Sequence, residues 1–170
     1  FEPSAADIRK LSGADILICI GSFAETWLEG AIRASGNRSL RVLSMTDVCE
    51  LHEEEELPGL GEHDHHHDHE HGEGTQVEYD EHVWTSFGNM ARIVTAVRDT
   101  LTAALPEQAA TLQANAASYL LELDALRADY QATVASAADP VLVIADRYPF
   151  AYLMRELGVV CYAAFPGCSS

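Results

Sequence analysis

The sequence lacks any run of about 20 apolar residues, the length needed to cross a bilayer, so it contains no candidate transmembrane helix. Positive charge is missing from a long internal stretch: no Lys or Arg occurs between Glu50 and Glu81, where 13 Asp and Glu residues lie. This stretch accounts for most of the formal net charge of −17. Such a charge repels phosphate and attracts divalent cations, which argues against nucleic acid as a partner.

The four cysteines, Cys19, Cys49, Cys161 and Cys168, include no Cys-x-x-Cys pair. Cys19 and Cys161 lie inside apolar runs that predict strands, and a free Cys behaves as a small core residue. Buried free thiols are therefore the first interpretation. A disulfide between Cys161 and Cys168 is the alternative if the compartment is oxidising.

The rest of the chain predicts a globular α/β protein. Its 170 residues are 48% hydrophobic, enough for a domain with a core, and apolar runs of strand length alternate with segments of helical periodicity. The predicted strands are 15–20, 40–43, 141–145 and 159–164, and the predicted helices are 4–11, 23–34, 89–105, 106–138 and 150–157. The helix at 106–138 would run about 48 Å, longer than one small domain is wide, so we expect it to cross from one lobe to another.

Histidine and acidic residues are concentrated in one tract. Residues 62–71 run Glu-His-Asp-His-His-His-Asp-His-Glu-His, and imidazole and carboxylate groups are the usual ligands of Zn²⁺ and related ions. Four glycines and the absence of apolar periodicity between 53 and 75 predict a loop. We interpret this loop, about 52–79, as a metal-capture segment; the alternative is a solvated tract without a selected role. The capturing residues would be His63, His65, His66, His67, His69 and His71.

No motif for enzyme chemistry accompanies this tract. The sequence lacks the Gly-x-x-x-x-Gly-Lys-(Ser/Thr) phosphate loop, the His-Glu-x-x-His zinc helix and the Gly-x-Ser-x-Gly nucleophile turn. Asp80, Glu81 and Asp146 have side chains that suit an acid or a base, but side-chain type is their only support. A metal-dependent enzyme, or a metallochaperone with a histidine-rich store, therefore stays the alternative to a receptor that binds metal without a chemical step.

Three parts of the chain carry a resemblance to a known family. Residues 1–8 run Phe-Glu-Pro-Ser-Ala-Ala-Asp-Ile, residues 14–17 and 25–28 run Ala-Asp-Ile-Leu and Glu-Thr-Trp-Leu, and residues 80–84 run Asp-Glu-His-Val-Trp after the histidine-rich tract. Together they resemble the zinc- and manganese-binding solute-binding proteins of bacterial ABC transporters, whose Asp-Pro-His-x-Trp motif matches 80–84. The resemblance implies two α/β lobes with parallel sheets, joined by one long helix, with the metal between them.

The family's proteins are longer, so we expect a fragment in which both lobes are incomplete. Its parts would be an N-terminal lobe at 1–105, a linking helix at 106–138 and the start of a second lobe at 139–170. Further family ligands would then lie outside this chain. The resemblance also implies a monomer outside the cytoplasm, held at a membrane only through an N-terminal lipid anchor that this chain does not contain.

The resemblance implies metal ligands only where the motifs match. His82 takes the place of the motif's histidine, so it is the first candidate ligand; the alternative is a histidine near a helix whose ring is satisfied by hydrogen bonds. Residues 146–152 depart from the family's His-x-x-Phe-x-Tyr pattern: with Phe150 and Tyr152 in register, Arg147 falls on the histidine position and Asp146 is its neighbour. Asp146 follows the predicted strand at its carboxyl end, where ligands bind in open α/β sheets, so it is the second candidate. The alternatives are that it caps the next helix or pairs with Arg147.

The function implied is capture of a divalent metal in an interlobe cleft and its delivery to an ABC permease. Zn²⁺ is the expected cargo. Mn²⁺ is the alternative because a site with fewer imidazoles and more oxygens shifts metal preference in that direction.

Overall fold

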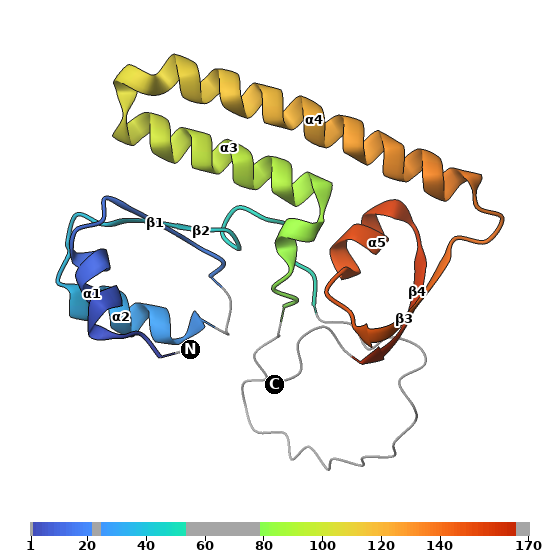
Figure 1. The fold of residues 1–170 in the computed structure, drawn as a ribbon, viewed down its shortest axis with the longest axis horizontal. Coiled ribbons are helices and arrows are strands. Elements are labelled where there is room, and N and C mark those ends of the chain that lie inside the picture. Colours follow the sequence, from blue (N-terminus) through green and yellow to red (C-terminus); the bar gives the residue numbers. More distant parts are fainter. Residues whose placement is uncertain (1, 22–24, 54–78, 166–170) are drawn as a thin grey trace, which may run out of the picture.

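The computed structural model describes residues 2–21, 25–53 and 79–165. Its elements are α1 (Ala5–Ser12), β1 (Ile16–Cys19), α2 (Trp27–Ser35), β2 (Arg41–Ser44), η2 (Val83–Thr85), α3 (Phe87–Ala104), η3 (Pro106–Gln108), α4 (Ala109–Ser136), β3 (Val141–Arg147), α5 (Ala151–Leu157) and β4 (Val160–Phe165). Two separate parallel pairs, β1–β2 and β3–β4, lie in different halves of the molecule below α3 and α4 (Figure 1). This confirms the predicted α/β fold with two lobes and one spanning helix.

The N-terminal lobe is built from local signals that the sequence displays. The Ser4 hydroxyl accepts the Asp7 N–H at 3.3 Å, and the Asp7 carboxylate accepts the Ser4 N–H at 3.1 Å, which is a capping box that starts α1. Gly36, with φ of 65°, ends α2 in the left-handed region that glycine adopts without strain. The predicted helix at 23–34 is shorter in the structure, because α2 begins at Trp27; residues 22–24 lie outside the described ranges.

Helix α4 spans the molecule. Its 28 residues extend about 42 Å, and Figure 1 shows it running along α3 and then beyond it, over α5. The apolar residues of α4 do not all face the protein. Tyr119, Leu126 and Tyr130 are exposed. Leu123 and Arg127, which lie one helical turn apart, are half-buried, and the Arg127 side chain pairs with Glu156.

The main core cluster joins the two lobes. Its buried members are Val83 and Ile93 from the η2–α3 region and Tyr152 from α5. Half-buried apolar residues pack around them: Met45, Val48, Cys49, Leu51, Trp84, Met90 and Val97. Trp84 therefore packs against the buried core. Because α5 contributes Tyr152 to this cluster, the C-terminal lobe is fixed against the segment that carries His82.

The C-terminal sheet differs from expectation in two respects. Strand β3 continues to Arg147, two residues past the predicted end, through an irregularity between Ile144 and Arg147. The apolar run of this strand would suit burial on both faces, which the structure does not show. Val141 and Val143 are 50% and 73% exposed, because the described part of the lobe buries only the face with Tyr148, Cys161 and Ala163.

Cys19 and Cys161 are buried free thiols, as the first interpretation expected, and Cys49 is a half-buried free thiol. Burial raises the pKa of Cys19 and of Cys49 above the ordinary thiol value. Cys168 lies outside the described residues, so the alternative pairing with Cys161 stays a prediction.

Candidate metal centre

His82 lies where the chain enters α3. It directly precedes the short turn η2, and Val83, the next residue, is fully buried in the core cluster. The His82 side chain is 12% exposed, and its ring lies 5.4 Å from that of Trp84, centroid to centroid. The backbone on the C-terminal side of His82 is therefore held by packing, which gives the imidazole a defined position.

Asp80 fixes the orientation of this imidazole. Its Oδ1 accepts the main-chain N–H of His82 at 2.8 Å and lies 2.7 Å from the ring Nδ1. A carboxylate only accepts hydrogen bonds, so the pair selects the tautomer with the proton on Nδ1 and the lone pair on Nε2. The Asp80 side chain is 8% exposed, which shields the pair from water. Carboxylates hold metal-binding histidines in this way and make the ring more basic.

The chain segments on either side of residues 54–78 meet beside this pair. Glu53 and Tyr79 form an antiparallel bridge, and the Asp80 N–H donates to the His52 carbonyl at 3.0 Å. We call residues 52–53 and 79–80 the neck. In sequence, the six tract histidines lie between the two segments of the neck, outside the described residues, so their capture role stays a prediction.

Tyr152 reaches the neck from α5. Its hydroxyl donates to the Asp80 carbonyl at 2.8 Å and accepts the His52 N–H at 3.0 Å. The side chain is only 3% exposed, and burial raises the pKa of this phenol. The His52 ring also lies 5.1 Å from the Tyr152 ring. In the sequence, Tyr152 serves only to align residues 146–152 with the family pattern, and no local signal marks His52.

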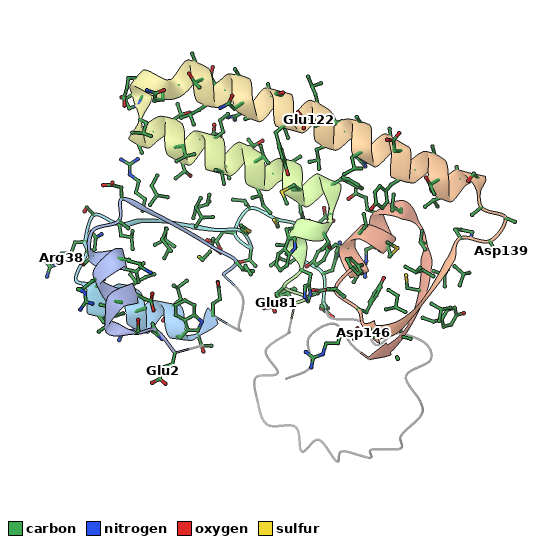
Figure 2. All side chains as sticks on the ribbon, in the orientation of Figure 1. Glu2, Arg38, Glu81, Glu122, Asp139 and Asp146 are labelled. Carbon is green, nitrogen blue, oxygen red and sulfur yellow. The ribbon has the colours of Figure 1, made fainter. Side chains whose placement is uncertain are left out.

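Asp146 is the second-to-last residue of β3, and its side chain is exposed. Figure 2 shows Glu81 and Asp146 at one edge of the molecule, with Asp139 at the far end of the C-terminal lobe. Burial, the neighbouring Cys161 and the negative charge of Asp80 all raise the pKa of Tyr148, which follows β3. Between the pairs Ile144–Ala163 and Arg147–Phe165, β3 contains one residue more than β4. Such an extra residue redirects side chains at the end of a strand.

Of the two alternatives for Asp146, capping of α5 is not seen, and a contact with Arg147 is present through the Arg147 main chain. Asp146 Oδ1 accepts the main-chain N–H of Arg147 at 2.7 Å rather than an N–H of α5, whose first turn has no side-chain cap. Across the described ranges no group of three or more His, Cys, Asp or Glu residues is close enough to hold a metal. His82 and Asp146 are therefore candidate ligands of an assembly that the described part of the chain does not complete.

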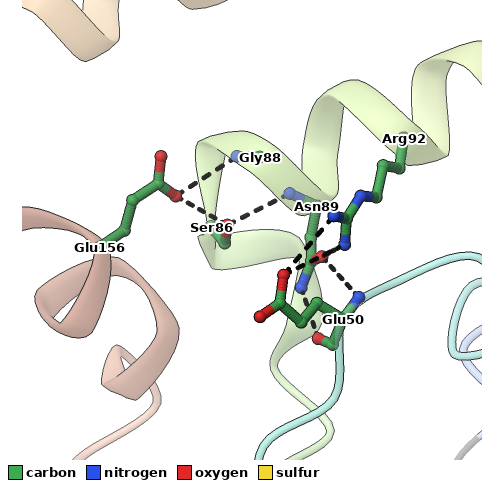
Figure 3. A network of polar contacts seen from close by, with 6 residues as sticks. All are labelled: Glu50, Ser86, Gly88, Asn89, Arg92 and Glu156. Carbon is green, nitrogen blue, oxygen red and sulfur yellow. Dashed lines mark hydrogen bonds and ion pairs between the residues drawn. The ribbon is translucent and has the colours of Figure 1, made fainter.

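A second polar site lies on the other side of the neck and has a different character. Glu156 accepts from the Ser86 hydroxyl at 2.7 Å and from the Gly88 N–H at 3.3 Å, so a side chain of α5 caps α3 (Figure 3). Its other oxygen lies 3.0 Å from Arg127 Nε, close enough for an ion pair although not aligned as a hydrogen bond. Arg92, Arg127 and Arg155 line the adjoining cleft of about 350 Å³, and three guanidinium groups disfavour a cation there.

All 170 residues match one protein family, described as the zinc-uptake complex component A, periplasmic (ZnuA). The chain belongs to the ZnuA family. This confirms the resemblance seen in the sequence, and the family's description refers to the periplasm, in agreement with the expected location outside the cytoplasm. In the part of the chain that the structure describes, no helix combines the length and the apolarity needed to cross a membrane.

Individual ZnuA-family proteins are similar over nearly the whole chain. The zinc-binding protein AdcA of Streptococcus pyogenes serotype M3 is 32% identical over 166 residues, a match that covers 94% of this chain and 31% of AdcA. The crystal structure of the Zn(II)-bound ZnuA-like domain of Streptococcus pneumoniae AdcA aligns with a TM-score of 0.71 and 26% identity, over 99% of this chain and 54% of that one. The periplasmic zinc-binding protein TroA of Treponema pallidum shares the fold, with a TM-score of 0.74, 22% identity and coverage of 100% and 55%. This chain thus spans less than a third of the length of that curated relative.

Proposed function

We propose that this chain forms the metal-binding part of a receptor that captures Zn²⁺ between its lobes, with His82 as a ligand, and delivers it to an ABC permease. The observation that carries the proposal is the Asp80–His82 pair, in which a buried carboxylate holds the imidazole with its lone pair on Nε2. Metal-binding histidines almost always donate their other ring N–H to a carboxylate, a main-chain carbonyl or water, as this pair does. The names of the similar proteins refer to zinc and give the Mn²⁺ alternative no support.

Asp146 is the second ligand in this proposal. It lies at the carboxyl end of β3, in the strand irregularity, and its lobe packs against the segment that carries His82 through Tyr152. Asp146 stands one residue before the position at which the family has an imidazole, and a carboxylate there still suits Zn²⁺, which accepts Asp oxygens at about 2.0–2.2 Å.

The histidine-rich segment, about 52–79, serves in this proposal as a capture loop. Its histidines alternate with carboxylates in the stretch that carries 13 acidic residues, so it concentrates divalent cations. The neck ties both ends of this segment next to the Asp80–His82 pair. Zinc released from the tract therefore has a short path to the cleft.

The predicted limits of 1–105, 106–138 and 139–170 and the monomeric state stay part of the proposal. The core cluster supports a close association of the lobes, because it draws residues from the N-terminal part and from α5. Anchoring through a lipid would depend on sequence outside this chain.

The proposal is tested by titrating the metal-free intact protein with Zn²⁺ and Mn²⁺ in a calorimeter. Three forms are compared: the parent, a form without residues 62–71, and His82→Ala in that shortened form. We expect the shortened form to keep one tight zinc site and His82→Ala to lose it. If all tight binding disappears with residues 62–71, the interlobe site is refuted and the tract alone binds metal.

A further inference from the structure

Tyr152 connects three elements that are far apart in the sequence. It belongs to α5 of the C-terminal lobe, and its hydroxyl bridges His52, 100 residues earlier, and Asp80, 72 residues earlier. Both bonds go to main-chain atoms on the two strands of the neck. Since the side chain is 3% exposed, water cannot replace the hydroxyl if it is removed.

The hydrogen bond to Asp80 acts on the residue that orients His82. The Asp80 carbonyl is held by Tyr152, the Asp80 N–H by the His52 carbonyl, and the Asp80 carboxylate holds the His82 ring. The main chain of Asp80 is therefore fixed at both of its polar groups. A carboxylate positions a ring accurately only when its own backbone is fixed, because a small rotation at Asp80 moves both contacts to His82.

We propose that Tyr152 is a positioning residue for zinc: it holds the neck from the opposite lobe, so that Asp80 presents the His82 imidazole in its metal-binding orientation. This inference rests on the proposed function. It adds that zinc affinity depends on contact between the lobes at a residue that does not touch the metal.

One turn farther along α5, Glu156 offers a matched comparison. Glu156 also joins α5 to the start of α3, through Ser86 and Gly88, but its contacts begin four residues after His82 and do not involve Asp80. Both side chains thus stabilise the junction, and only Tyr152 reaches the residue that orients the imidazole. A purely structural role would make the two substitutions equivalent for zinc binding.

The test uses the intact protein without residues 62–71, so that the tract histidines do not contribute. Tyr152→Phe, Glu156→Gln and Tyr130→Phe are compared by competition for Zn²⁺ with a chromophoric chelator, and the Nδ1 proton of His82 is followed by NMR in the metal-free state. Tyr130 is a half-exposed tyrosine on α4, so Tyr130→Phe controls for the loss of a tyrosine hydroxyl at a position away from the neck.

We expect Tyr152→Phe to raise the Kd for zinc about tenfold, as outer positioning residues do, and to speed exchange of the His82 Nδ1 proton. Glu156→Gln should lower the midpoint of unfolding with a Kd within about twofold of the parent, and Tyr130→Phe should change neither. An unchanged Kd in Tyr152→Phe, alongside loss of binding in His82→Ala, would overturn this inference and leave the proposed function intact. Equal effects of Tyr152→Phe and Glu156→Gln on Kd would also overturn it, whereas tight binding in His82→Ala would overturn both.

Discussion

Asp80 and His82 are joined twice through a single atom: Asp80 Oδ1 accepts the His82 main-chain N–H at 2.8 Å and lies 2.7 Å from the ring Nδ1. The two residues are separated by Glu81 alone, so the chain turns back on itself to make this contact. The double contact leaves the ring little freedom to rotate or to change tautomer. The metal-binding direction of His82 is therefore set by the protein before any metal arrives.

We predict that Asp80→Asn weakens zinc binding about 10- to 100-fold, the range seen when the carboxylate behind a metal-binding histidine is changed. The amide keeps one acceptor but loses the charge that makes the ring basic. Calorimetry in the form without residues 62–71 measures the effect. Asp99→Asn is the control, because Asp99 is largely exposed and pairs only locally, with Arg98. Equal affinities of Asp80→Asn and the parent would contradict the positioning role of Asp80.

The start of α3 depends on a contact from the other lobe. The Ser86 hydroxyl accepts the Asn89 N–H at 3.1 Å and donates to Glu156 at 2.7 Å. We predict that Ser86→Ala lowers the free energy of unfolding by about 1–2 kcal/mol, the usual cost of losing a helix cap. Urea unfolding of Ser86→Ala, Glu156→Gln and the double variant should show coupling of at least about 0.5 kcal/mol. Ser118→Ala, on the exposed face of α4, should leave the free energy of unfolding unchanged. If the effects of Ser86→Ala and Glu156→Gln on the free energy of unfolding simply add in the double variant, the two lobes do not share this cap.

The Cys49 thiol gives a prediction about pH. Burial raises its pKa above the ordinary value of 9.0, although the positive charge of Arg92 opposes the shift. Because the folded state holds the thiol proton more tightly than the unfolded state does, this contribution to stability is fully present below pH 9 and is lost as pH rises through the folded pKa.

Alkylation of native Cys49 by iodoacetamide should therefore need a higher pH than alkylation of the unfolded chain. Mass spectrometry of peptides labelled between pH 7 and pH 10 measures both. Arg92→Ala should shift the native profile to still higher pH, because it removes the charge that favours the thiolate. A native profile that coincides with the unfolded one would show that burial does not protect this thiol.

Local sequence signals were sufficient for the order of elements, whereas His82 became the first ligand candidate only through the resemblance of residues 80–84 to the family motif. The capping box at Ser4 and the strand-length apolar runs are short-range patterns, and Asp80-Glu81-His82 already contains the carboxylate two residues before the imidazole. Tyr152 was not found because its partners lie 72 and 100 residues away, and no local pattern encodes such a contact. The end of β3 was missed because Asp146 and Arg147 are polar, whereas pairing with β4 through an irregular register keeps them in the strand.

Asp146 is the weaker of the two ligand candidates, and its substitution gives a direct test. We predict that Asp146→Asn raises the Kd for zinc at least tenfold in the form without residues 62–71, because a charged oxygen ligand is replaced by a neutral one. Asp139→Asn is the matched control, since Asp139 lies just before β3, at the far end of the same lobe (Figure 2). A similar Kd for the two variants would remove Asp146 from the site.

Substitutions of Arg147 test which of two adjacent positions, 146 or 147, supplies the metal ligand. Arg147 is back in register with β4, opposite Phe165, whereas Asp146 lies in the irregular part of β3, where side chains do not follow the regular alternation. The proposal that Asp146 is the ligand implies that position 147 does not bind the same ion. We therefore predict that Arg147→His and Arg147→Met give the same small gain in zinc affinity, because each removes a positive charge near a cation site and neither adds a ligand. A gain of more than tenfold for Arg147→His over Arg147→Met, measured by the same chelator competition, would place the ligand at position 147. That result would make the present sequence a variant in which arginine has taken the place of a metal-binding histidine, with Asp146 as a bystander.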